Sequence, residues 1–334
     1  MNLLVLFCGL VLSLNAYAAA PGYHVVKKLA LGGEGGWDYL TVDNAARRLY
    51  ISRGTHVMVV DLATEKLAGD IPDTPGVHGI AVAPELNRGF ISNGRANTAS
   101  IFDLKTLKIL GQVKTGTNPD AILYDPATRR VFTFNGRSND ATVIDAATGE
   151  VLSTIPLGGK PEFARSDEMG KVYVNIEDKS EVVEIDSKNL TVLRRFSLNP
   201  GEEPSGMGFD VKHHLIFSGC HNKIMTVLDT VSGKVIAAVP IGEGVDGNGF
   251  DPETGLAFSS NGDGTLTVAR ESSPGKFEVA ETITTQQGSR TMTVDPKTHA
   301  VYLPAAQYAP PSSSAPGQRP AMVKDSFVIL VVGK

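Results

Sequence analysis

The sequence DAILYDPATRRVFTFNGRSNDATVIDAATGEVLSTIPLGG, residues 120–159, decides the fold of this chain. It contains four short runs rich in β-branched and aromatic residues, and turn-forming residues separate each run from the next. In the first turn, Asp125-Pro126-Ala127-Thr128, the proline presets the φ angle that the turn needs. None of the runs has the period of a helix. The pattern predicts one antiparallel sheet with strands at Ala121–Tyr124, Val131–Phe134, Ala141–Ile144 and Val151–Leu157.

The same unit recurs along the chain at a nearly constant spacing. The residue that opens the first turn of each unit recurs after 40, 42, 42, 43, 41 and 44 residues. An aspartate before the outer turn recurs independently after 42, 42, 41 and 43 residues. Four-stranded units of about 40 to 45 residues are typical of β-propeller blades, so the sequence predicts an all-β propeller with seven blades. The first markers are Asp43, Ala83, Asp125, Asp167, Asp210, Asp251 and Asp295, and the second are Asp61, Asp103, Asp145, Asp186 and Asp229.

The two ends of the repeat predict how the ring closes. Residues 23–33 resemble the fourth strand of a unit, whereas residues 327–333 resemble the third. We therefore expect the N-terminal strand to complete the last blade, which removes the free edges that invite aggregation. Since no linker-like change in composition interrupts the period, the sequence predicts a single propeller domain over residues 19–334.

Residues 1–18 have the pattern of a secretory signal peptide. Leu3–Leu14 is an apolar run of twelve residues, shorter than the roughly 20 that a membrane-spanning helix needs. Ala16-Tyr17-Ala18 is a cleavage sequence of small residues. We therefore expect a periplasmic or secreted protein whose mature chain begins near Ala19 and has no transmembrane segment.

The composition narrows the classes of partner. Hydrophobic residues make up 42% of the chain and charged residues 20%, which is ordinary for a globular protein. The formal net charge is −5, and the sequence has no cluster of Lys and Arg of the kind that nucleic-acid binding requires. We therefore expect a monomer whose partner is a small polar molecule or another protein, and we do not expect nucleic-acid binding.

The units resemble the YVTN repeats of the YncE-like family, which are exported bacterial propellers with seven blades. The resemblance covers residues 23–334, and it implies the fold more strongly than a function, because related propellers include both binding proteins and enzymes. The Asp-x-x-Thr-Gly turns and the turn Gly116–Pro119 match as well. The family tetrapeptide appears in degenerate form at residues 50–52, 90–93, 132–135, 173–175, 258–261 and 302–304.

A row of polar residues lies five positions before the first marker of each unit. In a propeller the innermost strands line the central channel, so we expect these seven side chains to converge on one mouth of the channel. The row contains four carboxylates, an imidazole, a hydroxyl and a guanidinium. Its members are Asp38, His78, Asp120, Glu162, Ser205, Asp246 and Arg290.

Three interpretations of this row are open from the sequence alone. The residues can simply hydrate a pore and cap backbone groups, as Asp often does at the start of a strand. They can bind a small polar ligand or a divalent cation such as Ca²⁺ or Mg²⁺, for which Asp38, Asp120, Glu162 and Asp246 are the predicted ligands. They can also catalyse a reaction, with a carboxylate or His78 as general base and Arg290 as anion stabiliser, as in a metal-assisted lyase or hydrolase. We prefer the non-enzymatic binding interpretation, and the sequence assigns no catalytic residue.

The loops over the same mouth carry further polar residues. Arg95 and Arg137 occupy equivalent positions in adjacent units, and two neighbouring guanidiniums are suited to an anionic or zwitterionic ligand. We include both, together with His221, among the predicted ligand-binding residues. The alternative is a solvated rim without a specific role. The loop residues are Arg53, His56, Arg95, Arg137, Glu177, Asp178, Cys220, His221 and Asp263.

Three other features have two interpretations each. Trp37 can pack between blades or offer a stacking surface to a ring or sugar. Cys220, the only cysteine of the predicted mature chain, can be a small apolar filler or a metal or redox residue. Residues 304–326 form a Pro- and Ser-rich insertion in the last unit, which we expect to be extended and mobile. The insertion is either a tolerated surface loop or an arm over the mouth.

Overall fold

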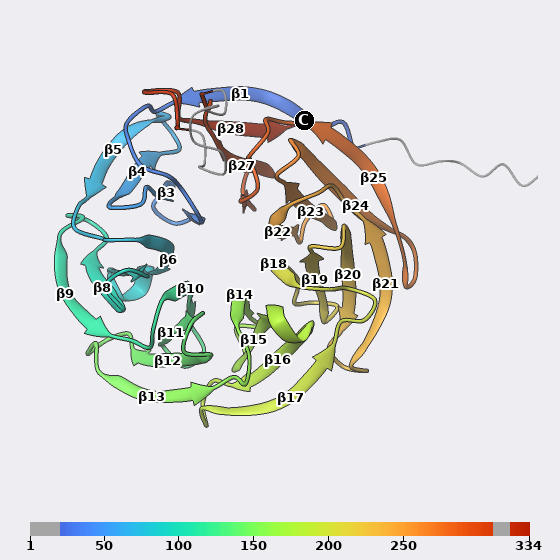
Figure 1. Ribbon diagram of the computed structural model, residues 1–334, viewed down its shortest axis with the longest axis horizontal. Helices are drawn as coiled ribbons and strands as arrows, with labels where there is room; N and C mark the ends of the chain where they lie inside the picture. The colour runs from blue at the N-terminus through green and yellow to red at the C-terminus, as the bar shows by residue number, and fades with distance from the viewer. Residues whose placement is uncertain (1–20, 310–320) are drawn as a thin grey trace, which may run out of the picture.

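The computed structural model describes residues 21–309 and 321–334. Within these residues, 28 strands form seven antiparallel sheets of four strands each, arranged as blades around a central channel (Figure 1). The predicted propeller and its blade count are therefore confirmed. Among the described residues, no helix has the length and apolar character that a membrane span needs. The predicted signal peptide lies outside the described residues.

Each of the first six blades is built from four consecutive strands, running from the channel outward. Two short 3₁₀ turns, Pro84–Leu86 and Glu177–Lys179, interrupt the loops. The first three blades are β2 (Leu40–Asp43), β3 (Arg48–Ser52), β4 (Val57–Asp61) and β5 (Lys66–Ile71); β6 (Val77–Ala83), β7 (Arg88–Asn93), β8 (Thr98–Asp103) and β9 (Ile109–Lys114); and β10 (Pro119–Asp125), β11 (Arg130–Asn135), β12 (Asp140–Asp145) and β13 (Val151–Pro156). The next three are β14 (Pro161–Ser166), β15 (Lys171–Ile176), β16 (Glu181–Asp186) and β17 (Thr191–Ser197); β18 (Pro204–Asp210), β19 (Leu215–Cys220), β20 (Ile224–Asp229) and β21 (Lys234–Pro240); and β22 (Val245–Asp251), β23 (Leu256–Asn261), β24 (Thr265–Ser273) and β25 (Lys276–Thr284).

The seventh blade joins the two ends of the chain. Its strands, from the channel outward, are β26 (Thr293–Asp295), β27 (Ala300–Ala305), β28 (Val328–Gly333) and β1 (His24–Ala30). In the antiparallel pairing of β1 with β28, His24 lies opposite Gly333 and Ala30 lies opposite Val328. The expectation that the N-terminal strand closes the ring is therefore confirmed.

The marker aspartates recur because they fasten turns and neighbouring blades. Asp145 accepts hydrogen bonds from the backbone N–H groups of Ala147 and Thr148, at 2.9 and 2.8 Å, so it caps the outer turn of its blade. Asp125 is fully buried and accepts hydrogen bonds from Ser166 and Ser187 of the next blade, at 2.7 and 2.6 Å. The aspartates thus recur in the sequence because each blade needs a capped turn and hydrogen bonds to its neighbour.

Hydrophobic packing between adjacent blades forms the core. One buried cluster combines Phe132 and Phe134 of β11 with Val172 and Val174 of β15, and all four side chains are fully buried. The outermost strands carry mostly exposed and partly buried side chains, since they face solvent. Burial of apolar area at seven such interfaces stabilises the ring without a disulfide, because the single described cysteine is free.

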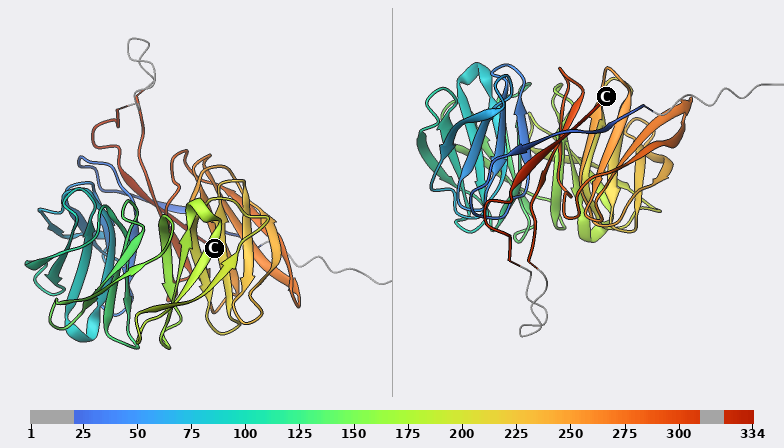
Figure 2. Two further views of the ribbon diagram at one scale, coloured as in Figure 1. Left: turned by 60° about the horizontal axis from the view of Figure 1, so that its bottom comes forward. Right: turned by 90° about the horizontal axis from the view of Figure 1, so that it is seen from above.

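The insertion in the last blade differs from the prediction in two ways. It starts after β27 at Ala306 rather than at residue 304, because Pro304 and Ala305 pair with β28. The described part of the insertion is also a hydrogen-bonded ribbon rather than an irregular segment: Ala309 N–H donates to Ala321 O, and Val323 N–H donates to Gln307 O, both at 2.8 Å. This stem projects from one face of the ring (Figure 2). The segment 310–320 lies outside the described residues.

A salt bridge between the last and first blades offers a test of ring closure. Arg47 holds the fully buried Asp295 through two hydrogen bonds, at 2.9 and 2.6 Å. We expect Arg47→Gln to lower the free energy of unfolding by about 2 kcal/mol, because it leaves a buried carboxylate without its cation. Urea denaturation at pH 7 measures this change. The control is Lys223→Gln, which breaks the exposed pair with Glu243 and should leave stability unchanged. Equal stability of the two variants would show that the Arg47 pair does not support closure.

Candidate functional site

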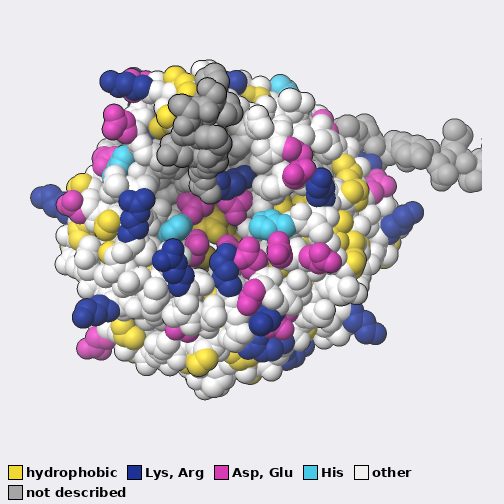
Figure 3. All heavy atoms as spheres, in the orientation of Figure 1, with side chains coloured by type: hydrophobic (Ala, Val, Ile, Leu, Met, Phe, Trp, Pro, Cys, Tyr) yellow, Lys and Arg dark blue, Asp and Glu magenta, His cyan; other side chains and the backbone are white. Residues whose placement is uncertain are grey.

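The seven residues of the predicted row are brought together at one mouth of the channel. Charged side chains and histidines surround a central hollow there, with hydrophobic atoms at its bottom (Figure 3). Five inner strands shift register within their first four residues, where the row residue lies. Such β-bulges leave a residue unpaired and re-aim its side chain. The local backbone therefore turns the row toward the mouth, where its members form three separate clusters.

The first cluster consists of Asp38, His78 and Asp120 from three successive blades. His78 Nδ1 lies 2.6 Å from Asp38 Oδ2 and 3.5 Å from Asp120 Oδ1. One ligand atom from each residue lies within 4.8 Å of the other two, a spacing that can hold a metal ion. Gly94 makes room for the imidazole, because a Cβ there would come within 2.6 Å of His78 Nε2. The cluster is half-buried and lies at the open end of the channel.

Burial and mutual repulsion set the protonation of this cluster. Burial raises the pKa of Asp38, and it raises the pKa of Asp120 to about 7 despite the opposing charge of His78. Burial alone would lower the pKa of His78, but the hydrogen bond to Asp38 and the charge of Asp120 outweigh it and raise that pKa to about 9. At neutral pH the ion-free cluster therefore holds an imidazolium that donates to Asp38.

The second cluster contains Glu162 and a lysine that lies outside the predicted row. Lys160 Nζ lies 2.7 Å from Glu162 Oε1 and also pairs with Glu177. Burial raises the pKa of Glu162 to about 8, and the charge of Asp120 adds to the rise. Lys160 lies two positions before Glu162, where most other units have Gly or Asn. This departure from the repeat is the feature of the sequence that could have predicted a role for Lys160 at the mouth.

The third cluster contains the remaining three row residues. Asp246 accepts hydrogen bonds from Ser205 Oγ at 2.8 Å and from Arg290 Nε at 2.6 Å. Its carboxylate is thus paired with a cation, as is that of Glu162. Of the four predicted cation ligands, the structure therefore groups Asp38 and Asp120 with His78, and it places Glu162 and Asp246 in separate ion pairs.

The loop residues divide into rim and structural positions. Arg95 and Arg137 are exposed, and the exposed His221 lies 3.4 Å from Glu203. Arg53 is fully buried instead: it donates to the carbonyls of Gly32, Glu34 and Gly35 and lies 3.7 Å from the centre of the Phe327 ring. The expectation that Arg53 belongs to the polar rim is wrong. The other loop residues fasten the loops, through contacts of His56 with Asp70, Glu177 with Lys160, Asp178 with Lys160 N–H, and Asp263 with Glu243 N–H.

For both Trp37 and Cys220, the structure supports the packing interpretation. The Trp37 ring lies 5.4 Å from the Phe327 ring and 6.2 Å from the Tyr308 ring, at the base of the insertion. Cys220 is fully buried, and burial raises the pKa of its thiol to about 12. A thiol of this kind is unreactive at neutral pH.

Two aromatic residues form a floor beneath the mouth, and the row of polar residues gave no sign of them. Tyr39 and Phe163 each come directly after a row residue. At the equivalent position the other five units have Gly79, Ala121, Gly206, Gly247 and Thr291. The rings of Tyr39 and Phe163 meet edge to face, with centroids 5.0 Å apart. Tyr39 is buried, and its pKa is raised well above the usual value by burial and by the carboxylates above it. Comparing this second row across the units would have revealed the floor.

The protonation of the mouth leads to a pH prediction for chelator-treated protein. We expect the free energy of unfolding to fall as the pH rises from about 5 to 9, by up to about 1.4 kcal/mol per pH unit for each proton concerned. The reason is that folded Asp120, Glu162 and His78 keep protons at pH values where the unfolded chain has released them. Urea denaturation across this range measures the slope. The double variant Asp120→Asn, Glu162→Gln should have a flatter profile, and a slope equal to that of wild type would contradict the assignment.

Comparison with known proteins supports the fold alone. The sequence matches no family model and no curated protein. Among solved structures, a chain of the Kuenenia stuttgartiensis hydrazine synthase is similar in fold, with a TM-score of 0.73 over 88% of this chain and 96% of that chain. The two sequences are 16% identical. At this identity the similarity indicates a shared fold and carries no information about activity.

Proposed function

We propose that this chain is an exported binding protein that holds a divalent cation, or a small polar ligand, at the channel mouth and has no enzymatic activity of its own. The observation that carries the proposal is the grouping of Asp38, His78 and Asp120, whose ligand atoms lie within 4.8 Å of one another. Each of the three comes from a different blade, so the site requires the first three blades to pack side by side.

The charges around this cluster favour a cation there. Asp246 already has Arg290 as a partner, and Glu162 lies against Lys160, which it shares with Glu177. Asp38 and Asp120 share one imidazolium, which leaves an excess of negative charge once both carboxylates ionise. A divalent cation that replaces the proton of His78 neutralises both carboxylates and removes their repulsion.

The donor set indicates the class of metal. Ca²⁺ and Mg²⁺ prefer oxygen ligands only, whereas an imidazole together with two carboxylates suits a transition metal such as Zn²⁺ or Mn²⁺. We therefore place Zn²⁺ and Mn²⁺ ahead of Ca²⁺ and Mg²⁺ for this site. Since His78 must lose its proton to coordinate, affinity should increase as the pH rises toward 9.

The remaining parts of the proposal rest on the sequence. The repeat signatures support assignment to the YncE-like, YVTN-repeat propellers, and the pattern of residues 1–18 supports export to the periplasm or the medium. The exposed Arg95, Arg137 and His221 at the rim would contact a polar molecule or a protein partner that covers the mouth. We propose a monomer as the functional unit.

Metal titration tests the proposal directly. We expect wild-type protein, stripped with chelator, to bind one equivalent of Zn²⁺ or Mn²⁺ by isothermal titration calorimetry at pH 8. Asp38→Asn and Asp120→Asn should each weaken binding by about 100-fold or more, because each removes a charged ligand. Asp246→Asn is the matched control, since this carboxylate lies at the same mouth but is paired with Arg290. Wild-type protein that binds no metal, or a control variant that loses as much affinity as the others, would refute the cation site.

A metal-assisted lyase or hydrolase is the second candidate, and one observation favours it. Three protein ligands leave positions open in the coordination shell, as catalytic sites do, and Arg290 lies at the same mouth. The test is incubation of the metal-loaded protein with a periplasmic metabolite extract. Retention of a component without chemical change supports the binding protein, whereas turnover that Asp120→Asn abolishes supports the enzyme.

A further inference from the structure

A second compartment lies in the channel below the aromatic floor. It is a cavity of about 450 Å³ that the inner strands of all seven blades line, and none of the seven row residues contributes to its wall. Tyr39 and Phe163 line it from above, since they occupy the level between the row and the cavity. The cavity is therefore a separate site on the same axis.

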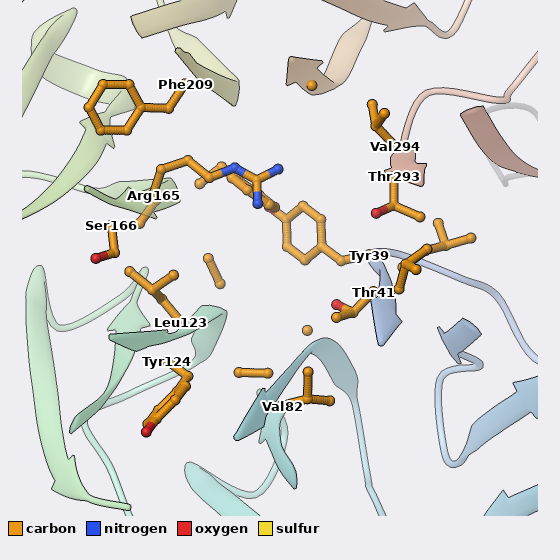
Figure 4. Close-up of a pocket in the computed structure, with 18 of the residues that line it drawn as sticks. Tyr39, Thr41, Val82, Leu123, Tyr124, Arg165, Ser166, Phe209, Thr293 and Val294 are labelled. Carbon is orange, nitrogen blue, oxygen red and sulfur yellow. The ribbon is translucent and has the colours of Figure 1, made fainter. Parts of the chain in front are cut away.

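One positively charged residue dominates the wall of this cavity. Two positions before each first-turn marker, the inner strands carry six uncharged residues and a single arginine, Arg165. Figure 4 shows the Arg165 side chain reaching into the channel toward the ring of Tyr39. Glu168, the one acidic residue of the wall, is exposed on the turn after β14. The residues at these seven positions are Thr41, Ala81, Leu123, Arg165, Gly208, Gly249 and Thr293.

Few of the described residues compensate the positive charge of the Arg165 guanidinium or accept its hydrogen bonds. Its Nε donates to Met207 O at 3.1 Å, and its central carbon lies 4.8 Å from the centre of the Phe163 ring. It forms no ion pair with a described residue, and its two terminal nitrogens donate to none of them. Burial lowers the pKa of Arg165 to about 10, so the group stays charged at neutral pH. A half-buried cation with two free forked donors matches a carboxylate.

The rest of the wall combines apolar side chains with polar ones such as Thr41, Ser166 and Thr293. Val82, Leu123, Phe209 and Val294 surround the channel at the level of the guanidinium or next to it (Figure 4). The volume of the cavity falls within the range of about 300–1,000 Å³ that is usual for small-ligand sites. A ligand that fits this wall has one anionic end and an apolar body.

We propose that this cavity binds a small organic monocarboxylate, with the carboxylate on Arg165 and the hydrocarbon body against the apolar side chains of the wall. The proposal is independent of the cation site, because the Tyr39–Phe163 floor lies between the two and they share no charged residue. Either site can therefore fail its test while the other passes.

Titration with a homologous series of carboxylates tests the proposal. The probes are acetate, butyrate and hexanoate, and the matched controls are 1-hexanol and hexylammonium, all measured by calorimetry at pH 7 in low-chloride buffer. We expect affinity to increase about fourfold per methylene from acetate to hexanoate, as burial of CH₂ groups predicts. Hexanol and hexylammonium should bind at least about tenfold more weakly than hexanoate, since neither offers a carboxylate to the guanidinium.

Two variants locate the binding to Arg165. Arg165→Gln should weaken hexanoate binding at least about tenfold, whereas Arg165→Lys, which keeps the charge, should retain most of it. Thermal unfolding confirms that each variant is folded, and Lys223→Gln, at an exposed position, should bind hexanoate like wild type. The proposal is overturned if folded Arg165→Gln binds hexanoate as tightly as wild type, if hexanol binds as tightly as hexanoate, or if wild type binds no carboxylate of the series.

Discussion

The antiparallel pairing of β1 with β28 is the constraint on which the rest of the structure depends. It joins residues near the two ends of the chain in one sheet, so that the seventh blade can pack between the sixth and the first. Because the ring is closed, the starts of all inner strands face a single axis. Asp38 then lies within hydrogen-bond distance of His78, 40 positions later in the chain, while Thr291 donates to the backbone carbonyl of Asp38 across the closure.

Closure crowds charges at the mouth, and local compensation decides what each of them can do. Arg290 pairs with Asp246, whereas Lys160 is shared by Glu162 and Glu177. In the cluster of Asp38, His78 and Asp120, one imidazolium faces two carboxylates, so negative charge exceeds positive charge once both carboxylates ionise. Its chemical character thus depends on contacts between blades rather than on any contiguous motif.

The sequence was sufficient for the fold because the fold is periodic. Each predicted strand of the repeat 120–159 falls on an observed strand, and the marker aspartates recur for the physical reason that they cap turns and tie blades together. The row of site residues could be predicted from the same register. Its division into clusters could not, because it depends on which side chains meet at the mouth and on Lys160, which departs from the repeat. Arg53 was misassigned because it is buried by backbone carbonyls of Gly32 and Glu34 and by the ring of Phe327, contacts between distant parts of the chain that its position in one unit does not reveal.

The aromatic floor bears on how occupants of the axis exchange with solvent. The rings of Tyr39 and Phe163 meet edge to face across the channel, between the polar row and the cavity, so they narrow the passage between the two. A cation at the mouth and a ligand in the cavity would then exchange with solvent through opposite faces of the ring.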